Sequence, residues 1–536
     1  MTSSSGDVLS SYHEDVASPF VGTGWVSRSL ITLCVFLSFI ASSATRRPVP
    51  SVNEPHYLCK AKHYWQPDWC SGDLFLESSN PHQVFYQTVG SLTQWLTLEQ
   101  TAWAGRLLAL GCLSIGWTRL FLRLLKSPWQ CLAAAWIFLL LQSLGNFSGE
   151  WLIGGVESKV LAYAFVFLGL ADALDRRWLL TGLWTGMAIS FHPIVGLWAV
   201  VAGALSAVGW IMIKKVSLSQ VMSKYGRPFI GSSIVLVLTS LPGLLPAMRL
   251  LSGNDPAISA KADMLQVGER LAHHLDPARF PLESYRYYGL MLILIVLLWR
   301  LGQRTPRRDL FTGFVGATLV IALVGAMIGW GPRPLSLLPF SGTRVWLLKF
   351  YPFRLADLFI PLLLTVTVLT AVFEPSKARE LTAGRFRFVW LLCAAAFIVS
   401  LLLPSPDQNP SRMSASAKGD WIAACEWLRQ ETPTDSLVHA ANENWAVKWF
   451  SHRAEYVNYK DCPQDAAGIV EWARRLRLIN QWARESLTEG TISKADLATL
   501  HDETGIDYMI VSRFGPIDMK PIYSNNSFQI YDIHDE

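Results

Sequence analysis

Acidic, histidine and aromatic side chains crowd one stretch of the sequence, residues 45–99, directly after a long apolar segment. Glu54 and Asp73 are the carboxylates of this stretch that could act as a general base. A carboxylate beside the end of a membrane span, among aromatic rings, is poorly solvated, and this favours proton transfer at neutral pH. The alternative is a structural role for Glu54 at a helix start, with Asn53 as N-cap and Pro55 in the first turn.

Cationic side chains that could hold a phosphate occur elsewhere. Arg354 precedes an apolar segment, and a guanidinium can donate two parallel hydrogen bonds to phosphate oxygens. His273 and His274 could bind an anionic headgroup, whereas a metal shared by adjacent helical residues is not expected. Lys60, in the stretch after the first apolar segment, is a further candidate for binding the ligand. The alternatives are an Arg354–Asp357 ion pair one helical turn apart, and a plain surface loop around the histidines.

A second group of charges lies where a later apolar segment begins. It comprises Glu150, Glu157 and Lys159. Charge at membrane depth is costly unless it is paired or functional, so we expect either an internal ion pair or contact with a substrate. His192, at the break before Pro193, is expected to be a hydrogen-bonded residue at the interface.

The elements that must position these residues are membrane spans. The 536 residues are 51% hydrophobic and 16% charged, with 23 tryptophans, whereas a soluble protein has about 25% charged residues. Apolar runs of about 18 residues or more exclude a large soluble protein. No basic arm, zinc-ligand spacing or aromatic–basic strand pattern indicates nucleic-acid binding.

The pattern predicts a polytopic α-helical membrane protein with about 11 transmembrane helices and a C-terminal extracytoplasmic α/β domain. Residues 1–24 are expected to be a disordered cytoplasmic N-terminus, 25–404 the transmembrane domain and 405–536 the α/β domain. The expected spans are roughly residues 25–44, 103–122, 129–146, 155–173, two within 178–213 separated at His192-Pro193, 228–248, 287–301, 310–330, 355–373 and 388–404.

Lys and Arg gather in every second connection between these spans, for example at Arg176-Arg177 and Lys214-Lys215. With these connections in the cytoplasm, the N-terminus is inside, and the C-terminal domain is outside. The predicted outer loops are residues 45–99, 252–285 and 331–353.

Four of the eight cysteines fall in predicted outer segments. Cys59 and Cys70 lie in the first outer loop, and Cys425 and Cys462 lie in the tail. An oxidising compartment would allow the bridges Cys59–Cys70 and Cys425–Cys462, and free thiols are the alternative.

The tail alternates between helical and strand patterns. Helices are expected around Trp421–Leu428, over 442–451 and over 465–487, and strands over 436–441, 454–459, 506–512 and 527–533. No nucleophile elbow, phosphate loop or metal-ligand spacing occurs in it. We expect a domain that docks or shapes a substrate.

The layout resembles the GT-C superfamily of membrane glycosyltransferases, which use polyprenyl-phosphate-linked sugars. The residues that carry the resemblance are Asn53-Glu54-Pro55-His56-Tyr57 after the first span, and the segments 506–511 and 521–531 of the tail. More narrowly, the chain is similar to uncharacterised bacterial membrane proteins with such a tail. The resemblance implies a multi-pass protein of the bacterial inner (cytoplasmic) membrane, with partners limited to membrane lipid, the lipid-linked sugar donor and an unknown acceptor.

By this resemblance, Glu54 would deprotonate an acceptor hydroxyl and Asp73 would orient the sugar or the acceptor. Arg354, with His273 or His274, would neutralise the leaving phosphate, and a divalent metal could take part. A second acid would have to come from Glu150 or Asp276. The alternatives are a transporter, which would show charges at the membrane midplane, and a catalytically inactive membrane scaffold.

Overall fold

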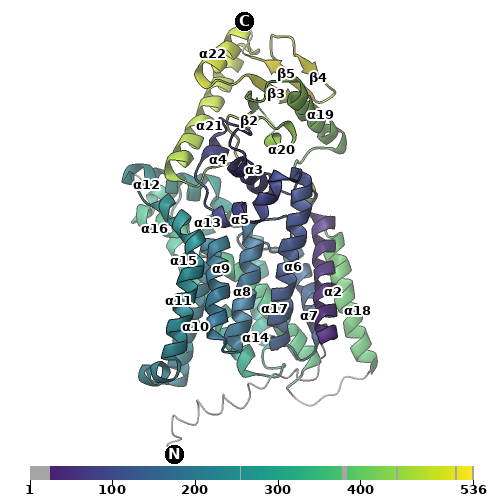
Figure 1. Cartoon of the computed structure of the whole chain (residues 1–536), viewed down its shortest axis with the longest axis vertical. Helices are drawn as coiled ribbons and strands as arrows, with labels where there is room; N and C mark the ends of the chain where they lie inside the picture. Colours follow the sequence, from purple (N-terminus) through teal and green to yellow (C-terminus); the bar gives the residue numbers. More distant parts are fainter. Residues whose placement is uncertain (1–24, 254, 377–382, 442–444, 513–515, 534–536) are drawn as a thin grey trace, which may run out of the picture.

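Long helices form a bundle, and a smaller α/β domain is stacked on one end of it (Figure 1). We call this end of the bundle the domain face. The computed structural model describes residues 25–253, 255–376, 383–441, 445–512 and 516–533. The predicted disordered segment 1–24 therefore lies outside the described residues.

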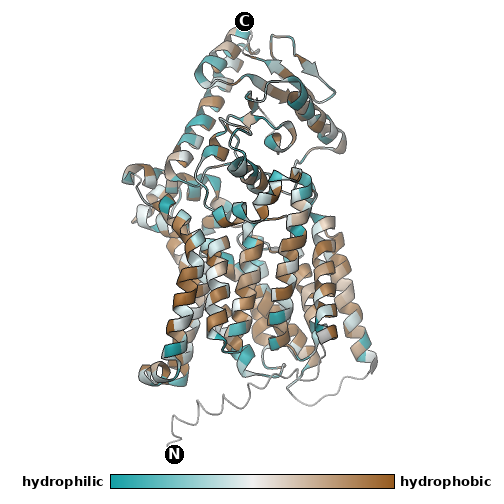
Figure 2. Cartoon of the chain, viewed as in Figure 1, coloured by the Kyte–Doolittle hydropathy of each residue, from teal (hydrophilic) through white to brown (hydrophobic). Residues whose placement is uncertain are grey.

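Seven described helices are long and apolar enough to cross a membrane. Apolar residues dominate their middle parts, and polar residues gather toward their ends (Figure 2), as expected of helices that face lipid or one another. The protein is therefore membrane-associated. The seven are α2 (Trp25–Arg46), α6 (Leu98–Leu124), α10 (Pro193–Lys214), α11 (Leu218–Leu251), α15 (Pro306–Gly329), α17 (Arg354–Phe373) and α18 (Ala383–Leu402).

Four further helices of the bundle are shorter and coincide with the remaining segments predicted to span. They are α7 (Pro128–Leu144), α8 (Ser158–Leu174), α9 (Trp178–Phe191) and α14 (Leu282–Leu298). Each has 17 residues or fewer, about 25 Å of helix at 1.5 Å per residue. The predicted segments are thus helical, and the count of about 11 crossings stays a prediction.

The break predicted at His192-Pro193 is present. Helix α9 ends at Phe191, and α10 begins at Pro193, with His192 in an extended conformation between them. Proline disfavours helical geometry in the residue before it and is well suited to the first turn of a helix. The break therefore places the His192 side chain at a junction of two helix ends.

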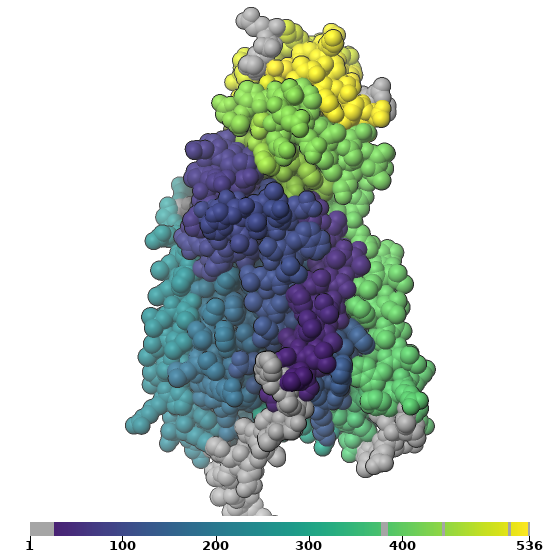
Figure 3. Space-filling model, turned by 45° about the vertical axis from the view of Figure 1, so that its right-hand side comes forward, coloured from purple at the N-terminus to yellow at the C-terminus, as the bar shows by residue number. Residues whose placement is uncertain are grey.

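The connections on the domain face fold into short helices. The segment after α2 lies between the bundle and the α/β domain, as the purple and blue atoms of Figure 3 show. The connecting elements are α3 (Glu54–Trp65), α4 (Leu74–Glu77), α5 (Gln83–Gln87), η1 (Val89–Gln94), α12 (Pro256–Leu265), η2 (Gln266–Arg270), α13 (Ala272–Leu275), η3 (Pro277–Arg279), η4 (Leu335–Leu337), α16 (Ser341–Leu348) and η5 (Pro406–Gln408).

The α/β domain is a five-stranded mixed sheet with helices on its faces. The strand order is β2-β1-β3-β5-β4; β1 pairs parallel with β2 and β3, and β5 pairs antiparallel with β3 and β4. Helix α22 and strand β4 were not predicted. The elements are α19 (Ala415–Glu431), β1 (Leu437–Ala440), α20 (Val447–Ser451), β2 (Ala454–Glu455), α21 (Ala466–Ser486), η6 (Leu487–Glu489), α22 (Lys494–Thr504), β3 (Tyr508–Ser512), β4 (Tyr523–Ser524) and β5 (Phe528–Asp532).

The predicted bridge Cys425–Cys462 is wrong in this structure, where both cysteines are free. The sheet has a separate apolar core on each face. Cys425 of α19 packs in the core that contains Trp421, whereas Cys462 packs in the core that contains Trp472. The two thiols therefore belong to different layers of the domain.

The predicted bridge Cys59–Cys70 is also absent, and both residues are free and buried. Cys59 lies on the buried side of α3, and Cys70 lies in the turn before α4 with a left-handed backbone (φ 56°). Burial raises the pKa of both thiols well above the usual value. The thiols are therefore held protonated, which suits packing rather than reactivity.

The buried histidine of strand β1 makes the stability of the protein depend on pH. Burial lowers the pKa of His439 to about 4, against about 6.5 for an unfolded histidine. The unfolded state therefore takes up a proton first, and stability is lost as the pH falls from about 6.5 toward 4. This residue alone is expected to contribute a loss of about 2 kcal/mol between pH 7.5 and 4.5. Thermal unfolding of His439→Leu should show a smaller loss than wild type; an equal loss would contradict the assignment.

Candidate functional site

Glu54 is bound on all sides by other parts of the chain. Its carboxylate accepts hydrogen bonds from Arg106 Nε (2.7 Å) and Nη2 (2.7 Å), and from the backbone N–H groups of Ser51 (2.8 Å) and Val156 (2.9 Å). Glu54 and Arg106 have side chains that are 0% exposed. The pair ties the start of α3 to α6 and to the segment before α8. Glu54 thus has no oxygen directed at a substrate, and we do not assign it the role of base.

Asp73 joins the first connection to the α/β domain. Its Oδ1 accepts from the N–H groups of Phe75 and Leu76 and so caps α4. Its Oδ2 accepts from the Glu455 N–H (3.0 Å) and lies 3.1 Å from Lys448 Nζ. Asp73 is therefore committed to a helix cap and an interdomain contact.

Lys448 is the centre of that interdomain contact. Besides Asp73, its Nζ lies 3.0 Å from Glu455 Oε2 and 2.8 Å from Asp461 Oδ2, and its side chain is 4% exposed. Asp461 also lies 3.1 Å from His56 Nδ1 of α3. The Lys448 ammonium, with the hydrogen bond from His56, holds the pKa of Asp461 well below its usual value. This network fixes the α/β domain on the first connection.

Lys60 has a local structural role. Its ammonium donates to the Ser78 carbonyl (3.0 Å) and hydroxyl (2.8 Å) and to the Phe75 carbonyl, at the end of α4. Burial lowers the pKa of Lys60 to about 7. The structure does not bring Lys60 to Arg354, so it does not join the phosphate-binding candidates.

Arg354 lies in a buried cluster on the domain face. Its Nη1 lies 2.9 Å from His192 Nε2, its Nε lies 3.1 Å from Glu150 Oε2, and its guanidinium stacks 4.2 Å from the Tyr351 ring centroid. Arg354 Nε and Glu150 Oε1 are buried atoms without a hydrogen bond among the described residues. The alternative Arg354–Asp357 pair is not formed, because Asp357 is bound elsewhere. The cluster thus has unused hydrogen-bonding capacity.

Asp357 lies one helical turn after Arg354 in α17, and its carboxylate binds the backbone segment that carries Glu150. Its carboxylate accepts from the N–H groups of Phe147 (2.6 Å), Ser148 (2.8 Å) and Glu150 (2.9 Å). It also accepts from the Tyr288 hydroxyl at 2.5 Å. One acid therefore sets the position of the other against Arg354, and the rest of α17 supplies the rigid support.

A chain of contacts leads from Glu150 to the α/β domain. Lys159 Nζ lies 3.8 Å from Glu150 Oε2 and 3.3 Å from Glu157 Oε2. Glu157 Oε1 accepts from Asn53 Nδ2 (2.6 Å), and Asn53 Oδ1 accepts from Lys460 Nζ (2.6 Å). Of the two alternatives predicted for the charges at the start of α8, the internal ion pair is present, and the hydrogen bonds of Asn53 connect it to the tail.

The two predicted histidines of the 252–285 connection have different environments. His274 Nδ1 bonds to the Ser148 carbonyl, beside the backbone that carries Glu150, whereas His273 is exposed and its ring packs 4.0 Å from that of His274. Burial and the nearby His273 hold the pKa of His274 well below its usual value. His274 is therefore a neutral hydrogen-bonding group at the edge of the cluster.

Positive charge in the cluster comes from Arg and Lys, since its histidines are neutral. His82 Nδ1 lies 3.2 Å from the Ser158 hydroxyl, and its ring lies 5.2 Å from that of His192. Burial lowers the pKa of His82 to about 3. Within the described ranges, no three or more His, Cys, Asp or Glu side chains are grouped to hold a metal ion.

Of the predicted site residues, the structure brings together Arg354 and His274, and it adds Glu150, His192 and Lys159. Glu54, Asp73 and Lys60 lie in separate contacts. Arg106 and Lys460 were missed. A signal existed for Arg106, which is a charge near the start of an apolar segment. Lys460 belongs to no recognisable sequence motif, and its position near Asn53 results from the docking of the α/β domain.

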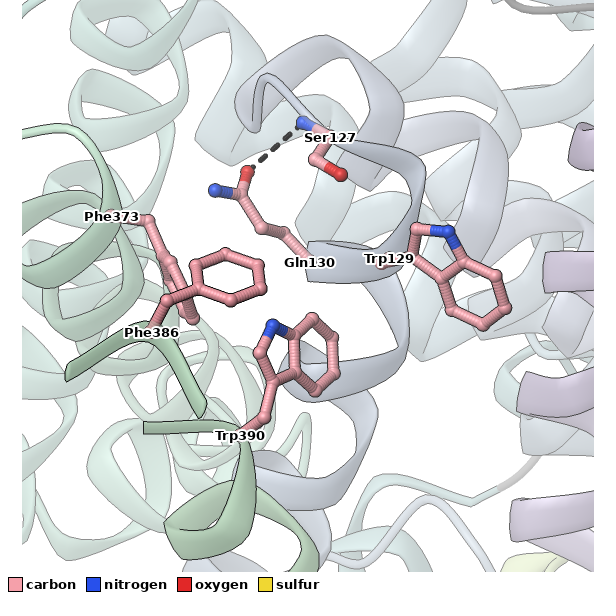
Figure 4. Close-up of a pocket in the computed structure, with 6 residues that line it drawn as sticks. All are labelled: Ser127, Trp129, Gln130, Phe373, Phe386 and Trp390. Atoms are coloured by element: carbon pink, nitrogen blue, oxygen red, sulfur yellow. Dashed lines mark hydrogen bonds between the residues drawn. The ribbon is translucent and has the colours of Figure 1, made fainter. Parts of the chain in front are cut away.

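An apolar cavity lies at the end of the bundle away from the domain face, between the start of α7, the end of α17 and the start of α18. Figure 4 shows the side chains that line it. Its volume is about 270 Å³, and the Gln130 side-chain oxygen in its wall accepts from the Ser127 N–H at 3.0 Å. It is lined by Ser127, Trp129, Gln130, Phe373, Phe386 and Trp390. None of these side chains is charged, so this cavity does not suit an anion.

Comparison with known families gives a match in the α/β domain. The family described as Domain of unknown function (DUF6798) matches residues 419–479, which run from α19 through β1, α20 and β2 into α21. No curated protein sequence matches the chain. The matched region contains Lys448, Glu455, Lys460 and Asp461, the residues that join the α/β domain to the domain face.

Proposed function

We propose that the protein is a membrane glycosyltransferase of the GT-C type, which transfers a sugar from a polyprenyl-phosphate donor to an acceptor hydroxyl at the domain face. The observation that carries the proposal is the buried cluster of Arg354, Glu150 and His192. It combines a guanidinium for phosphate with a carboxylate for proton transfer, and both have unused hydrogen-bonding atoms.

In the proposed reaction, Glu150 takes the proton of the acceptor hydroxyl. The hydroxyl oxygen then forms a bond to the anomeric carbon, and the bond from that carbon to the phosphate oxygen breaks. The phosphate leaves with the electron pair, and its added negative charge is stabilised by Arg354 and Lys159. Products are the glycosylated acceptor and the polyprenyl phosphate.

In this proposal the base is Glu150 and not Glu54, because Glu150 has an oxygen that no hydrogen bond of the described chain occupies. Glu54 accepts four hydrogen bonds within the chain, whereas Glu150 Oε1 has none in the described structure. The backbone beside Glu150 is fixed by Asp357, which keeps the carboxylate in place during the reaction.

Arg354→Gln tests the proposal. Loss of one charged donor to a developing phosphate charge typically costs about 100-fold or more in rate. We expect transfer of labelled sugar from a polyprenyl-phosphate donor to fall by that factor, and mass spectrometry should find less polyprenyl phosphate co-purified with the variant. Glu150→Gln should lose transfer while it retains the lipid.

The matched control is Arg279→Gln, since Arg279 is an exposed arginine at the same end of the molecule. It should transfer sugar and retain lipid as the wild type does. Equal transfer by Arg354→Gln and wild type would overturn the proposal, as would the absence of any polyprenyl lipid from the purified wild-type protein.

A catalytically inactive scaffold is the second candidate. It is favoured by the observation that Glu54 and Asp73, the two acids predicted to be catalytic, both serve internal contacts. A scaffold would have no use for the buried hydrogen-bonding atoms that stay without a partner in the Arg354 cluster. Purified wild-type protein that retains no phosphorylated polyprenyl lipid, with an α/β domain that still captures a protein partner, would favour it.

A further inference from the structure

Two cations from distant parts of the sequence meet beside the Arg354 cluster. Arg270, at the end of η2, donates from Nη2 to the carbonyl of Lys460 at 2.7 Å, across 190 residues of sequence. Lys460 lies in the α/β domain, and its Nζ donates to Asn53 Oδ1 at the start of α3. Arg270 also stacks on the Tyr459 ring at 5.2 Å. The bundle and the α/β domain thus share this corner.

The two cations differ from those of the Arg354 cluster because neither has an acidic partner. Arg354 and Lys159 each lie within 4 Å of a glutamate, whereas no carboxylate of the described chain is within ion-pair distance of Arg270 or Lys460. Arg270 Nε is a buried atom without a hydrogen bond there. Burial and the charge of Arg270 lower the pKa of Lys460 to about 8. An anion placed here would stabilise both cations.

The acid nearest in sequence does not neutralise the pair. Asp461 is engaged by Lys448 Nζ at 2.8 Å and by His56 Nδ1 at 3.1 Å. The network around Lys448 also fixes the loop that carries Lys460, so that the cation is held in place before a ligand arrives. Both Arg270 and Lys460 are partly exposed, which leaves them accessible to an anion.

Asn53 and Glu157 connect this corner to the first cluster. Lys460 Nζ bonds to Asn53, Asn53 bonds to Glu157, and Glu157 pairs with Lys159 beside Glu150. Cations therefore occur in two groups along one chain of polar contacts between the bundle and the α/β domain. The group without acidic partners, Arg270 and Lys460, suits a second negatively charged part of the same ligand.

We propose that Arg270 and Lys460 form a second anion subsite, and that the ligand of the domain face is a lipid diphosphate, with one phosphate at Arg354 and the other at this subsite. The inference rests on the proposed function and changes its donor from a lipid-monophosphate sugar to a lipid-diphosphate sugar, so that the lipid product of the same transfer step is a polyprenyl diphosphate. It also gives the region matched by the DUF6798 family a role, since that region supplies Lys460 to the ligand.

Calorimetry on the purified full chain tests the subsite, with farnesyl phosphate and farnesyl diphosphate as probes. Wild type is expected to bind the diphosphate about tenfold more tightly than the monophosphate, since the second phosphate gains charge-assisted hydrogen bonds. Lys460→Gln and Arg270→Gln should reduce this ratio to about twofold or less and leave monophosphate binding unchanged. Lys460→Arg, which keeps the charge, should retain the preference.

The matched control is Lys520→Gln, since Lys520 is an exposed lysine of the α/β domain. It should keep the wild-type ratio. Unfolding temperatures identify a variant that fails to fold, in which case Lys460→Arg and Arg270→Gln decide. If wild type binds both probes equally and Arg354→Gln weakens both, the second subsite is overturned and the proposed function stands. If wild type binds neither probe, the proposed function fails as well.

Discussion

Replacing Glu54 with Gln is expected to destabilise the folded protein by about 3–5 kcal/mol, the range for breaking a buried ion pair on one side. The amide supplies only one acceptor oxygen, whereas the carboxylate accepts from Arg106 twice and from Ser51 and Val156. Its NH₂ group would face N–H donors, and the Arg106 charge would be left buried. Thermal unfolding in detergent measures the loss.

Glu99→Gln is the matched control, because Glu99 is an exposed glutamate in the first turn of the helix that carries Arg106. It should change stability by less than about 1 kcal/mol. In a double-mutant cycle of Glu54→Gln with Arg106→Gln, the second substitution should cost much less than it does alone. A Glu54→Gln protein that unfolds as wild type does, yet transfers no sugar, would return the role of base to Glu54.

Lys448→Met is expected to release the α/β domain from the bundle. The substitution leaves Asp73, Glu455 and Asp461 close together without their shared cation, at a cost of about 3–5 kcal/mol. Limited proteolysis should cut faster between the bundle and the domain, near η5. Thermal unfolding should show a separate, earlier transition for the domain.

Acid pH provides a second measure of the same contact. Carboxylates that lose a neighbouring cation bind protons more readily, so the stability difference between wild type and Lys448→Met should narrow as the pH falls from 7 toward 4.5. Lys494→Met, at an exposed lysine of α22, serves as control and should match wild type at both pH values. A difference that stays constant with pH would show that the three acids do not feel the lysine charge.

Local patterns account for much of the fold. Apolar length located each helix of the bundle, and the proline after His192 located the junction of α9 and α10. The helix at Trp421 and the strands β1, β3 and β5 follow from side-chain periodicity. Strand β4 has two residues, too few for a period to be seen. The elements that were predicted form from residues close together in the sequence, and their patterns can therefore be recognised there.

The site depends on residues far apart in the sequence, and this is where prediction from the sequence was weakest. Glu54 was predicted to be a general base or part of a helix start, whereas its partner Arg106 lies 52 residues away within an apolar helix. In the sequence, a free carboxylate cannot be distinguished from the carboxylate of a buried ion pair until its partner is known. Glu150, Glu157 and Lys159 were located by their position at a span start. Lys460 and Arg270 come together only when the α/β domain docks on the connection that carries η2.

The contact between Asp73 and the backbone of Glu455 spans 382 residues of sequence, which has a consequence for biosynthesis. The ribosome delivers the first connection long before the residues that cover it. Strand β1 lies between β2 and β3 in the sheet, so the domain can close only when Tyr508 and the segment after it have emerged. Until then Asp73 and His56 stay uncovered. Completion of the polar layer thus comes late in synthesis, and a chain that ends before the α/β domain leaves these charged groups without their partners.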